Sequence, residues 1–151
     1  MVVCAASALS CVLLAGCNGG IHWEGPSYSD ASATARRTNK LTFVYFRSWY
    51  LVECTNFEEQ ILKQPDILAE TRSVVCVVLD YDWDRPLAQK WGLKTVPAFA
   101  IVAPDGNVLV RQAAPITHDD LLRAIRSAKK GATGPATQPA VPAKPPASPK
   151  P

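Results

Sequence analysis

The chain has 151 residues, 48% of them hydrophobic and 19% charged, which corresponds to about one domain with enough apolar side chains for a buried core. The formal net charge is +3, but residues 41–130 carry eleven acidic and eleven basic side chains, so the excess lies in the flanks. A neutral middle region lacks the basic face that nucleic-acid binding requires, and this class of function is excluded.

An apolar leader opens the chain. Residues 1–16 contain no charged side chain, and their apolar run is shorter than the about 20 residues of a membrane-spanning helix. The run has the length of a signal-peptide hydrophobic region. Leu14-Ala15-Gly16-Cys17 resembles the lipobox of bacterial lipoproteins, in which the signal is cut before the cysteine and the thiol is acylated. We therefore predict a signal peptide over residues 1–16 and lipidation of Cys17; simple secretion and an uncleaved anchor are the alternatives.

This processing places the protein outside the cytoplasm, in the cell envelope and anchored to a membrane by lipid; a soluble secreted or periplasmic protein is the alternative. Residues 17–28 are expected to form the lipidated tether. Of the five cysteines, only Cys54 and Cys76 then remain as thiols of the mature domain, in a compartment that tolerates disulfides.

The opposite end of the chain is rich in proline. Residues 131–151 contain seven of the thirteen prolines, together with Ala, Thr and Lys. Such a segment cannot form ladder hydrogen bonds or bury much apolar surface, so we expect a disordered, extended tail of polyproline type. A solvated tail is the simpler interpretation, and docking to a partner is the alternative.

Strand and helix patterns alternate between these flanks, over residues 29–130. Runs of β-branched and aromatic residues predict strands, and helical spacing, glycine and proline mark the helices and their ends. The predicted elements are a helix over 29–38, a strand over 41–46, a helix that carries Cys54, Phe57 and Ile61 and ends at Pro65, a strand over 73–79, a helix over 86–91, strands over 98–103 and 108–111, and a last helix capped by Thr117. This order predicts an α/β fold: a three-layer α/β/α sandwich around a mixed, mostly parallel sheet.

Several motifs of this region together resemble those of thioredoxin-like domains, over about residues 41–130. They are most similar to small envelope proteins that resemble the thioredoxin domain of disulfide-interchange proteins. The motifs are Leu79-Asp80-Tyr81-Asp82, Leu87 to Leu93, Thr95-Val96-Pro97-Ala98-Phe99 and Pro104-Asp105-Gly106. The resemblance implies a cis peptide bond between Val96 and Pro97, facing the redox site, with the backbone of Val96 able to pair with an extended peptide.

The redox motif itself departs from the family. Thioredoxins carry Trp-Cys-x-x-Cys after the first strand, whereas this chain has Ser-Trp-Tyr-Leu-Val-Glu-Cys-Thr from residue 48. If Cys54 aligns with the second cysteine, Leu51 replaces the attacking cysteine, and Tyr45 takes the place of the acid often buried on the strand. If Trp49 aligns with the motif's tryptophan, Tyr50 replaces the attacking cysteine. Neither register supplies the first thiol.

Two hypotheses about function follow. Dithiol exchange needs an exposed thiolate and a second thiol nearby, and Cys76, in the middle of a predicted strand, is interpreted as core packing. We therefore expect a redox-degenerate binding or scaffold module that holds an extended peptide or an envelope protein. Its candidate binding residues are Trp49, Tyr50, Leu51, Val96 and Pro97.

The alternative is an enzyme, a thiol–disulfide oxidoreductase of thioredoxin type that acts through Cys54 alone. A helix N-terminus lowers the pKa of a thiol, but the helical stripe that Cys54 shares with Phe57 and Ile61 points it inward, where thiols are inert. Whether the protein is an enzyme therefore stays open, with Cys54 as the one catalytic candidate.

No metal or cofactor site is expected. His22 and His118 are far apart in sequence and have no second ligand at a suitable spacing. Asp80, Asp82 and Asp84 alternate after a strand, but the glycine and the distal glutamate of a calcium-binding loop are missing.

Overall fold

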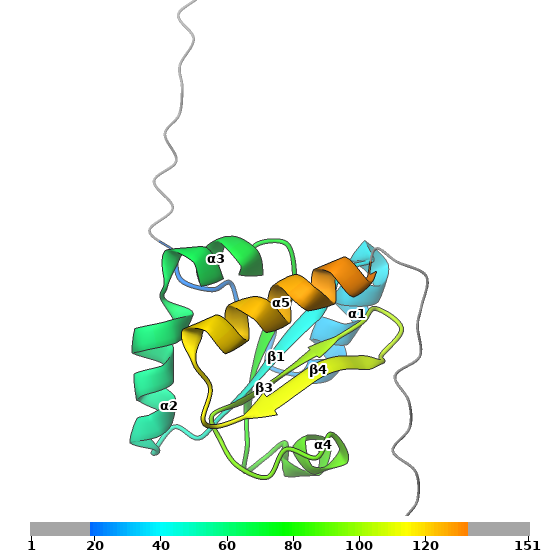
Figure 1. Cartoon of the computed structure of the whole chain (residues 1–151). Helices are drawn as coiled ribbons and strands as arrows, with labels where there is room; N and C mark the ends of the chain where they lie inside the picture. The colour runs from blue at the N-terminus through cyan, green and yellow to red at the C-terminus, as the bar shows by residue number, and fades with distance from the viewer. Residues whose placement is uncertain (1–18, 133–151) are drawn as a thin grey trace, which may run out of the picture.

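A computed structural model of the chain describes residues 19–132 (Figure 1). The predicted signal peptide, the lipidation of Cys17 and residues 133–151 of the predicted tail lie outside the described residues. The elements are α1 (Tyr28–Thr38), β1 (Thr42–Arg47), α2 (Val52–Phe57), the π-helical segment η1 (Glu58–Leu62), α3 (Pro65–Thr71), β2 (Val75–Asp80), α4 (Arg85–Lys90), β3 (Ala98–Val102), β4 (Val108–Ala113) and α5 (His118–Ala132).

The four strands form one sheet in the order β2-β1-β3-β4. Strands β1 and β2 pair in parallel, as the intervening helices predict, whereas β1 pairs with β3, and β3 with β4, antiparallel. The prediction of a mostly parallel sheet was therefore wrong. The connection from β2 to β3 contains only the six-residue helix α4, which lies at the end of the sheet instead of crossing its face (Figure 1). The chain thus re-enters the sheet from the end where β2 stops, in the opposite direction.

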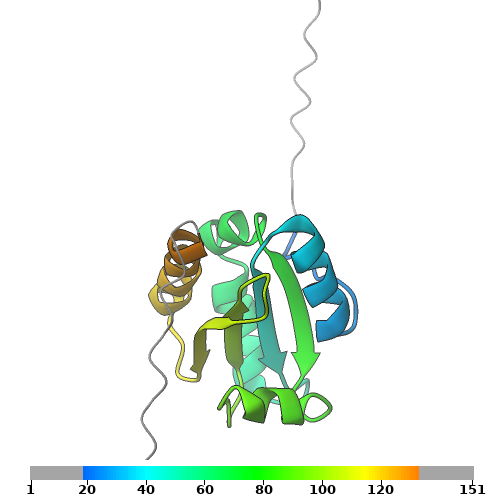
Figure 2. The same ribbon diagram turned by 90° about the vertical axis from the view of Figure 1, so that its right-hand side faces the viewer.

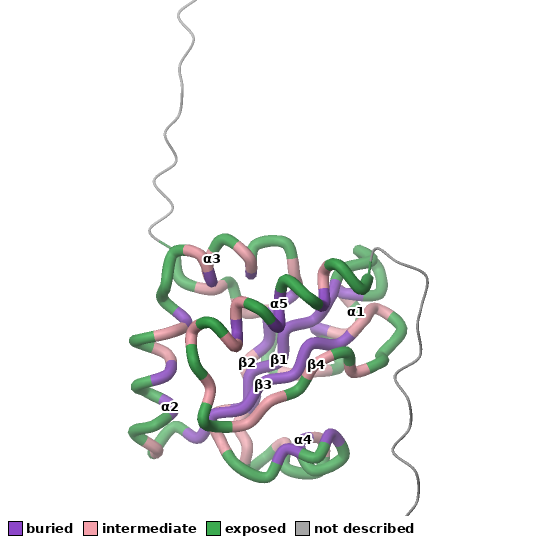
Figure 3. Tube along the Cα trace, in the orientation of Figure 1, coloured by how far each residue is buried: buried purple, intermediate pink, exposed green. Residues whose placement is uncertain are grey.

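Helices cover both faces of the sheet, which confirms the three-layer sandwich (Figure 2). Alternate side chains of each strand enter one of two apolar clusters, because successive side chains of a strand point to opposite faces. One cluster joins Val44 and Phe46 of β1 to α1 and α4, and the other joins Phe43 and Tyr45 to α2, α3 and α5. Strands β1 and β3 are buried over nearly their whole length (Figure 3). Each large apolar side chain so buried contributes about 1.5–3 kcal/mol to folding.

The helix after β1 is longer and less regular than the pattern predicted. Cys54 and Phe57 are buried as expected, but the next fully buried residue is Leu62, and Ile61 is only half-buried. The π-helical turn of η1 explains the change, because it adds one residue between successive inward positions. Pro65 does end this helix, but it also occupies the first turn of α3, a helix that was not predicted.

Helix α5 follows its predicted cap closely. The backbone N–H of Asp120 donates to the Thr117 hydroxyl at 3.2 Å, and the Asp120 carboxylate accepts from the Thr117 N–H in return. The helix continues to Ala132, two residues beyond the domain boundary expected at residue 130. Within residues 19–132, no helix is long and apolar enough to cross a bilayer.

The segment before α1 belongs to the folded domain. Trp23 forms a parallel bridge with Cys76 of the edge strand β2, and the N–H of Glu24 donates to the carbonyl of Cys76 at 2.6 Å. The Trp23 ring stacks on Phe43 and Tyr45, with centroid distances of 6.5 and 6.2 Å. The prediction that the tether reaches residue 28 was therefore wrong, because this indole adds apolar contacts to one face of the sheet.

Candidate functional site

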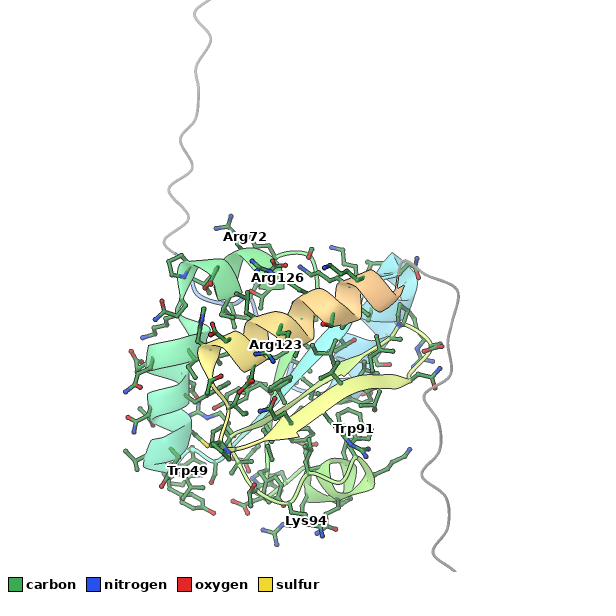
Figure 4. The ribbon with its side chains drawn as sticks, viewed as in Figure 1. Trp49, Arg72, Trp91, Lys94, Arg123 and Arg126 are labelled. Atoms are coloured by element: carbon green, nitrogen blue, oxygen red, sulfur yellow. The ribbon has the colours of Figure 1, made fainter. Side chains whose placement is uncertain are left out.

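The candidate site lies where β1 and β2 end. After β1, residues 48–51 form a loop that leads into α2; after β2, residues 81–84 lead into α4; and residues 94–97 precede β3. Figure 4 shows Trp49 of the first loop and Lys94 of the third at this end of the molecule. The topology thus brings together three loops that are far apart in the sequence.

Residues of the three loops and of the helices that follow the first two line an open pocket of about 430 Å³, which we call the Val96 pocket. The Tyr50 hydroxyl donates to the Asp82 carboxylate at 2.9 Å and joins the first loop to the second. This bond, followed by the ion pair with Arg85, holds the pKa of Asp82 below its ordinary value. The lining residues are Ser48, Tyr50, Leu51 and Glu53, then Tyr81, Asp82 and Arg85, and finally Lys94, Thr95 and Val96.

The structure assembles most of the predicted binding residues. Tyr50, Leu51 and Val96 line the pocket, and Trp49 lies beside it with its ring edge against Tyr50 at 5.6 Å. Pro97 is buried behind Val96 and does not line the pocket. The predicted group therefore forms one surface with a buried proline beneath it.

The peptide bond between Val96 and Pro97 is cis, as the resemblance implies. A second cis bond, between Ala114 and Pro115, was not predicted. The N–H of Ala114 donates to the carbonyl of Pro97 at 2.9 Å, so the two proline turns are connected. Among the hydrogen bonds within residues 19–132, none uses the backbone N–H or carbonyl of Val96. A donor and an acceptor thus remain available beside the pocket.

Cys54 is the third residue of α2, within the first turn of the helix, and has no exposed surface. Its sulfur accepts a hydrogen bond from the backbone N–H of Ser48 at 3.3 Å. Burial raises the pKa of the Cys54 thiol, and the Ser48 bond opposes this increase only in part. A buried thiol that remains protonated is a poor nucleophile, so the geometry favours the structural interpretation of Cys54 over the catalytic one.

The position of the missing nucleophile is occupied by Leu51. This residue precedes the first turn of α2 in an extended conformation, and its side chain makes no capping hydrogen bond. Leu51 is half-buried, whereas Tyr50, which takes this place in the other register, is exposed. Neither side chain carries the thiol that exchange chemistry requires.

A polar cluster lies beneath the site. The hydroxyl of buried Tyr45 donates to the Cys54 carbonyl at 3.4 Å and to the Glu58 carboxylate at 3.2 Å, and Arg47 faces the same carboxylate at 3.2 Å. Burial, followed by the neighbouring Cys54 and Glu58, raises the pKa of Tyr45 far above its ordinary value. Glu58 was not predicted as a partner of Tyr45. The only signal in the sequence is its place one helical turn after Cys54.

A buried hydroxyl also faces this region. Ser48 is almost fully buried, lines the Val96 pocket, and its Oγ has no hydrogen-bond partner among the described residues. Buried hydroxyls are normally paired, since an unpaired one costs about 1–3 kcal/mol. This hydroxyl is therefore an unpaired polar group in the wall of the pocket, covered from solvent in this structure.

Cys76 belongs to the core, as predicted. It is opposite Phe43 near the start of β1, whereas Cys54 lies beyond the end of that strand. Both cysteines are free, and burial raises the pKa of Cys76 to about 12. Cys76 is thus a small apolar side chain on the opposite end of the sheet from the Val96 pocket.

Large aromatic side chains are exposed around the pocket. Trp49 is 73% exposed, Tyr50 60% and Trp83 86%; we call these three residues the aromatic rim. Trp83 was missed in the sequence, although it lies among Asp80, Asp82 and Asp84 on a loop that could not bury it. Trp91 is core as predicted and packs edge-on against Phe46, with ring centroids 5.8 Å apart.

No metal centre emerges in the part of the chain that the structure describes. There, no three His, Cys, Asp or Glu side chains come together as ligands. His118 instead lies between two carboxylates, with its ring nitrogens 2.9 Å from Asp66 and 3.1 Å from Asp119. These neighbours, Asp66 first, raise the pKa of His118.

The sheet order, the flanking helices and the cis proline beside the first helix after β1 define a thioredoxin-like fold. No protein-family model matches the sequence, and no curated protein matches it. Solved structures do match.

A thioredoxin from Thermus thermophilus superposes with a TM-score of 0.66 at 19% identity, over 76% of this chain and 91% of that one. The oxidoreductase DsbH gives a TM-score of 0.62 at 17% identity, over 74% of this chain and 86% of that one. The C-terminal domain of DsbD from Neisseria meningitidis gives 0.57 at 14% identity, over 66% and 90%. At these identities the likeness establishes the fold, and function has to be argued from the site.

Proposed function

We propose that the protein is a binding or scaffold module that holds an extended segment of a peptide or envelope protein in the Val96 pocket without exchanging disulfides. One observation carries this proposal: the backbone N–H and carbonyl of Val96, unpaired within the described residues, lie beside an aromatic surface. An extended peptide pairs with such groups through main-chain hydrogen bonds and gains specificity from adjacent pockets. Tyr50 and Trp49 supply the apolar contact area that binding surfaces commonly use.

The absence of a reactive thiol at the site supports binding over catalysis. Leu51 or, in the other register, Tyr50 stands where the attacking cysteine belongs, and Cys54 is buried with a raised pKa. The single-cysteine oxidoreductase is therefore the less favoured function, since its only nucleophile would have to be uncovered before it reacts.

We further propose that the module works outside the cytoplasm, tethered to a membrane through lipid on Cys17. The sequence Leu14-Ala15-Gly16-Cys17 supports this location. The geometry suits it as well, because Gly19 and Gly20 lie next to α3, at the end of the molecule opposite Trp49 (Figures 1 and 4). A domain tethered at that end presents its pocket away from the membrane surface.

Peptide selection tests the binding proposal. Cysteine-free twelve-residue peptides displayed on phage are selected on the protein, and the best peptide is measured against Tyr50→Ala and Trp49→Ala. Each of these two substitutions should weaken peptide binding about tenfold or more, as truncation of an aromatic anchor does. Leu109→Ala is the matched control, because Leu109 is exposed on β4 outside the pocket, and it should bind as the parent does.

An N-methyl scan of the selected peptide tests the mode of binding. Blocking the one amide that donates to the Val96 carbonyl should weaken binding about tenfold, while methylation of outward-facing amides has little effect. A uniform response along the peptide would argue against strand-like pairing.

Insulin reduction separates the two functions. The binding module should show no thiol-dependent turnover above the background rate, and Cys54→Ser should leave that result unchanged. Turnover that disappears in Cys54→Ser would establish the oxidoreductase instead.

A further inference from the structure

The aromatic rim extends beyond the Val96 pocket and is unusually exposed for a folded domain. Trp83 does not line the pocket, yet it sits on the loop whose neighbours Tyr81, Asp82 and Arg85 do. Exposed apolar patches on soluble domains commonly mark sites where another chain docks.

We propose that the aromatic rim binds the chain's own proline-rich segment, residues 133–151, in a polyproline II conformation. This rests on the proposed function, because it names an occupant for the same surface. The segment is then an intramolecular ligand that an external peptide has to displace.

The chemistry of the segment matches an aromatic surface. Proline-rich strands of the form Pro-x-x-Pro dock in grooves lined by aromatic rings, since their conformation is largely set before binding. Polyproline II has three residues per turn, so prolines three apart lie on one face. The segment repeats this spacing at Pro139 and Pro142, at Pro142 and Pro145, and at Pro146 and Pro149.

The charges are complementary. Residues 133–151 contain Lys144 and Lys150 and no acidic residue. Trp83 follows Asp80, the last residue of β2, and lies between Asp82 and Asp84. Glu53 of the pocket lining adds a fourth carboxylate, against the basic side chains of Arg85 and Lys94. Lysines that flank a bound proline strand would therefore meet a locally acidic surface.

The segment is long enough to reach the rim. The segment begins after Ala132, the last residue of α5. The first turn of α5 follows the Ala114–Pro115 turn at the site end, and the axis of the helix spans about 22 Å. Nineteen residues of polyproline II extend about 59 Å, whereas a domain of this size is roughly 35 Å across. The rim is thus within reach, with residues to spare for the docked part.

The test uses NMR of the purified protein with its tail present. The indole N–H signals of Trp49 and Trp83, assigned through single Trp→Phe variants, are compared with those of a variant carrying Pro142→Gly, Pro145→Gly and Pro146→Gly. That variant keeps the length and both lysines but loses the preformed conformation. We expect both signals to shift, while those of Trp23 and Trp91 stay in place.

Two further measurements sharpen the result. Pro135→Gly, outside the repeated spacing, is the matched control and should leave all four indole signals unchanged. The triple variant should bind the phage-selected peptide about tenfold more tightly than the parent, because an intramolecular competitor has been removed.

Specific outcomes would overturn the inference. If the Trp49 and Trp83 signals are the same in the parent and the triple variant, the tail does not occupy the rim. If the difference disappears on dilution, the tail of a second copy is the occupant. In either case, selected-peptide binding that still depends on Tyr50 leaves the proposed function standing, and loss of that dependence would refute both.

Discussion

The four tryptophans fall into two pairs with opposite surroundings. Trp23 and Trp91 pack on the sheet: Trp23 stacks on Phe43, and Trp91 meets Tyr28 edge-on at 5.2 Å. Trp49 and Trp83 lie on loops at one end of the molecule and are largely exposed. Tryptophan therefore packs against the sheet in one pair and lies exposed at the surface in the other.

This difference separates indoles that stabilise the fold from indoles that the fold leaves exposed. A buried indole stabilises the fold, whereas an exposed one contributes little to stability and increases the tendency to associate. The exposed pair flanks the Val96 pocket, the cavity that also contains an unpaired buried hydroxyl among the described residues. The candidate site is thus formed by loops that the sheet positions.

The largest effect is expected when Trp91, the buried member of the packed pair, is changed. Trp91→Ala should lower the free energy of unfolding by about 3–5 kcal/mol, because it leaves a cavity beside Phe46 and Ala88. Trp83→Ala should change it by less than about 0.5 kcal/mol. Urea denaturation followed by circular dichroism gives both values. If Trp83→Ala lowered the free energy of unfolding by more than about 2 kcal/mol, the separation between packed and exposed tryptophans would be contradicted.

Two tyrosines provide a finer comparison of the same kind. Tyr45→Phe removes a buried hydroxyl that donates to Cys54 and Glu58, and should lower the free energy of unfolding by about 1–3 kcal/mol. Tyr50→Phe removes an exposed hydroxyl that donates to Asp82, and should cost less than about 0.5 kcal/mol. The urea midpoints of both variants decide the matter, and equal losses would argue against a special role for the buried cluster.

Much of the fold could be predicted from the sequence because local patterns determine it. The apolar runs of β1, β2 and β3 and the cap at Thr117 were all recognisable. The direction of β3 was not, because it depends on α4 lying at the end of the sheet. The packing of Trp23 was also missed, since a short segment that is bridged at one residue leaves no periodic signal.

The candidate site was predicted in part. Tyr50 and Leu51 were predicted because they interrupt the thioredoxin motif, and Val96 because it belongs to the Val-Pro motif. All three residues line the pocket. Glu58 was missed because its role depends on the turn of α2 that faces Tyr45. The exposure of Trp83 was missed because loop position, and no periodicity, determines it.

The two cysteines allow a test of the site's chemistry. Both thiols are buried and have raised pKa values, so near neutral pH they should react with iodoacetamide at least about tenfold more slowly in the folded protein than in urea. Mass spectrometry of the digested protein measures the labelling of Cys54 and of Cys76 separately, without contributions from the other cysteines. Rapid labelling of Cys54 with slow labelling of Cys76 would reveal an accessible thiolate and restore the oxidoreductase hypothesis.

The smallest expected effect concerns pH and the contacts between α3 and α5, far from the aromatic rim. Hydrogen bonding to His118 lowers the pKa of Asp66 below 3.8, and Lys129, followed by Arg126, lowers that of Glu70 below 4.5. These carboxylates stabilise the fold at pH values above their unfolded-state pKa values. This contribution is lost as the pH falls through the lowered pKa values of the folded state.

His118 works in the opposite direction. Its pKa is raised above 6.5 by Asp66 and then Asp119, so its contribution is complete below pH 6.5 and is lost as the pH rises through the raised value. Urea midpoints between pH 6 and pH 9 should therefore decline slightly in the parent and stay flatter in His118→Gln. His22→Gln, at a side chain that is 91% exposed, is the matched control and should follow the parent. A parent-like decline in His118→Gln would place the pH response on other groups.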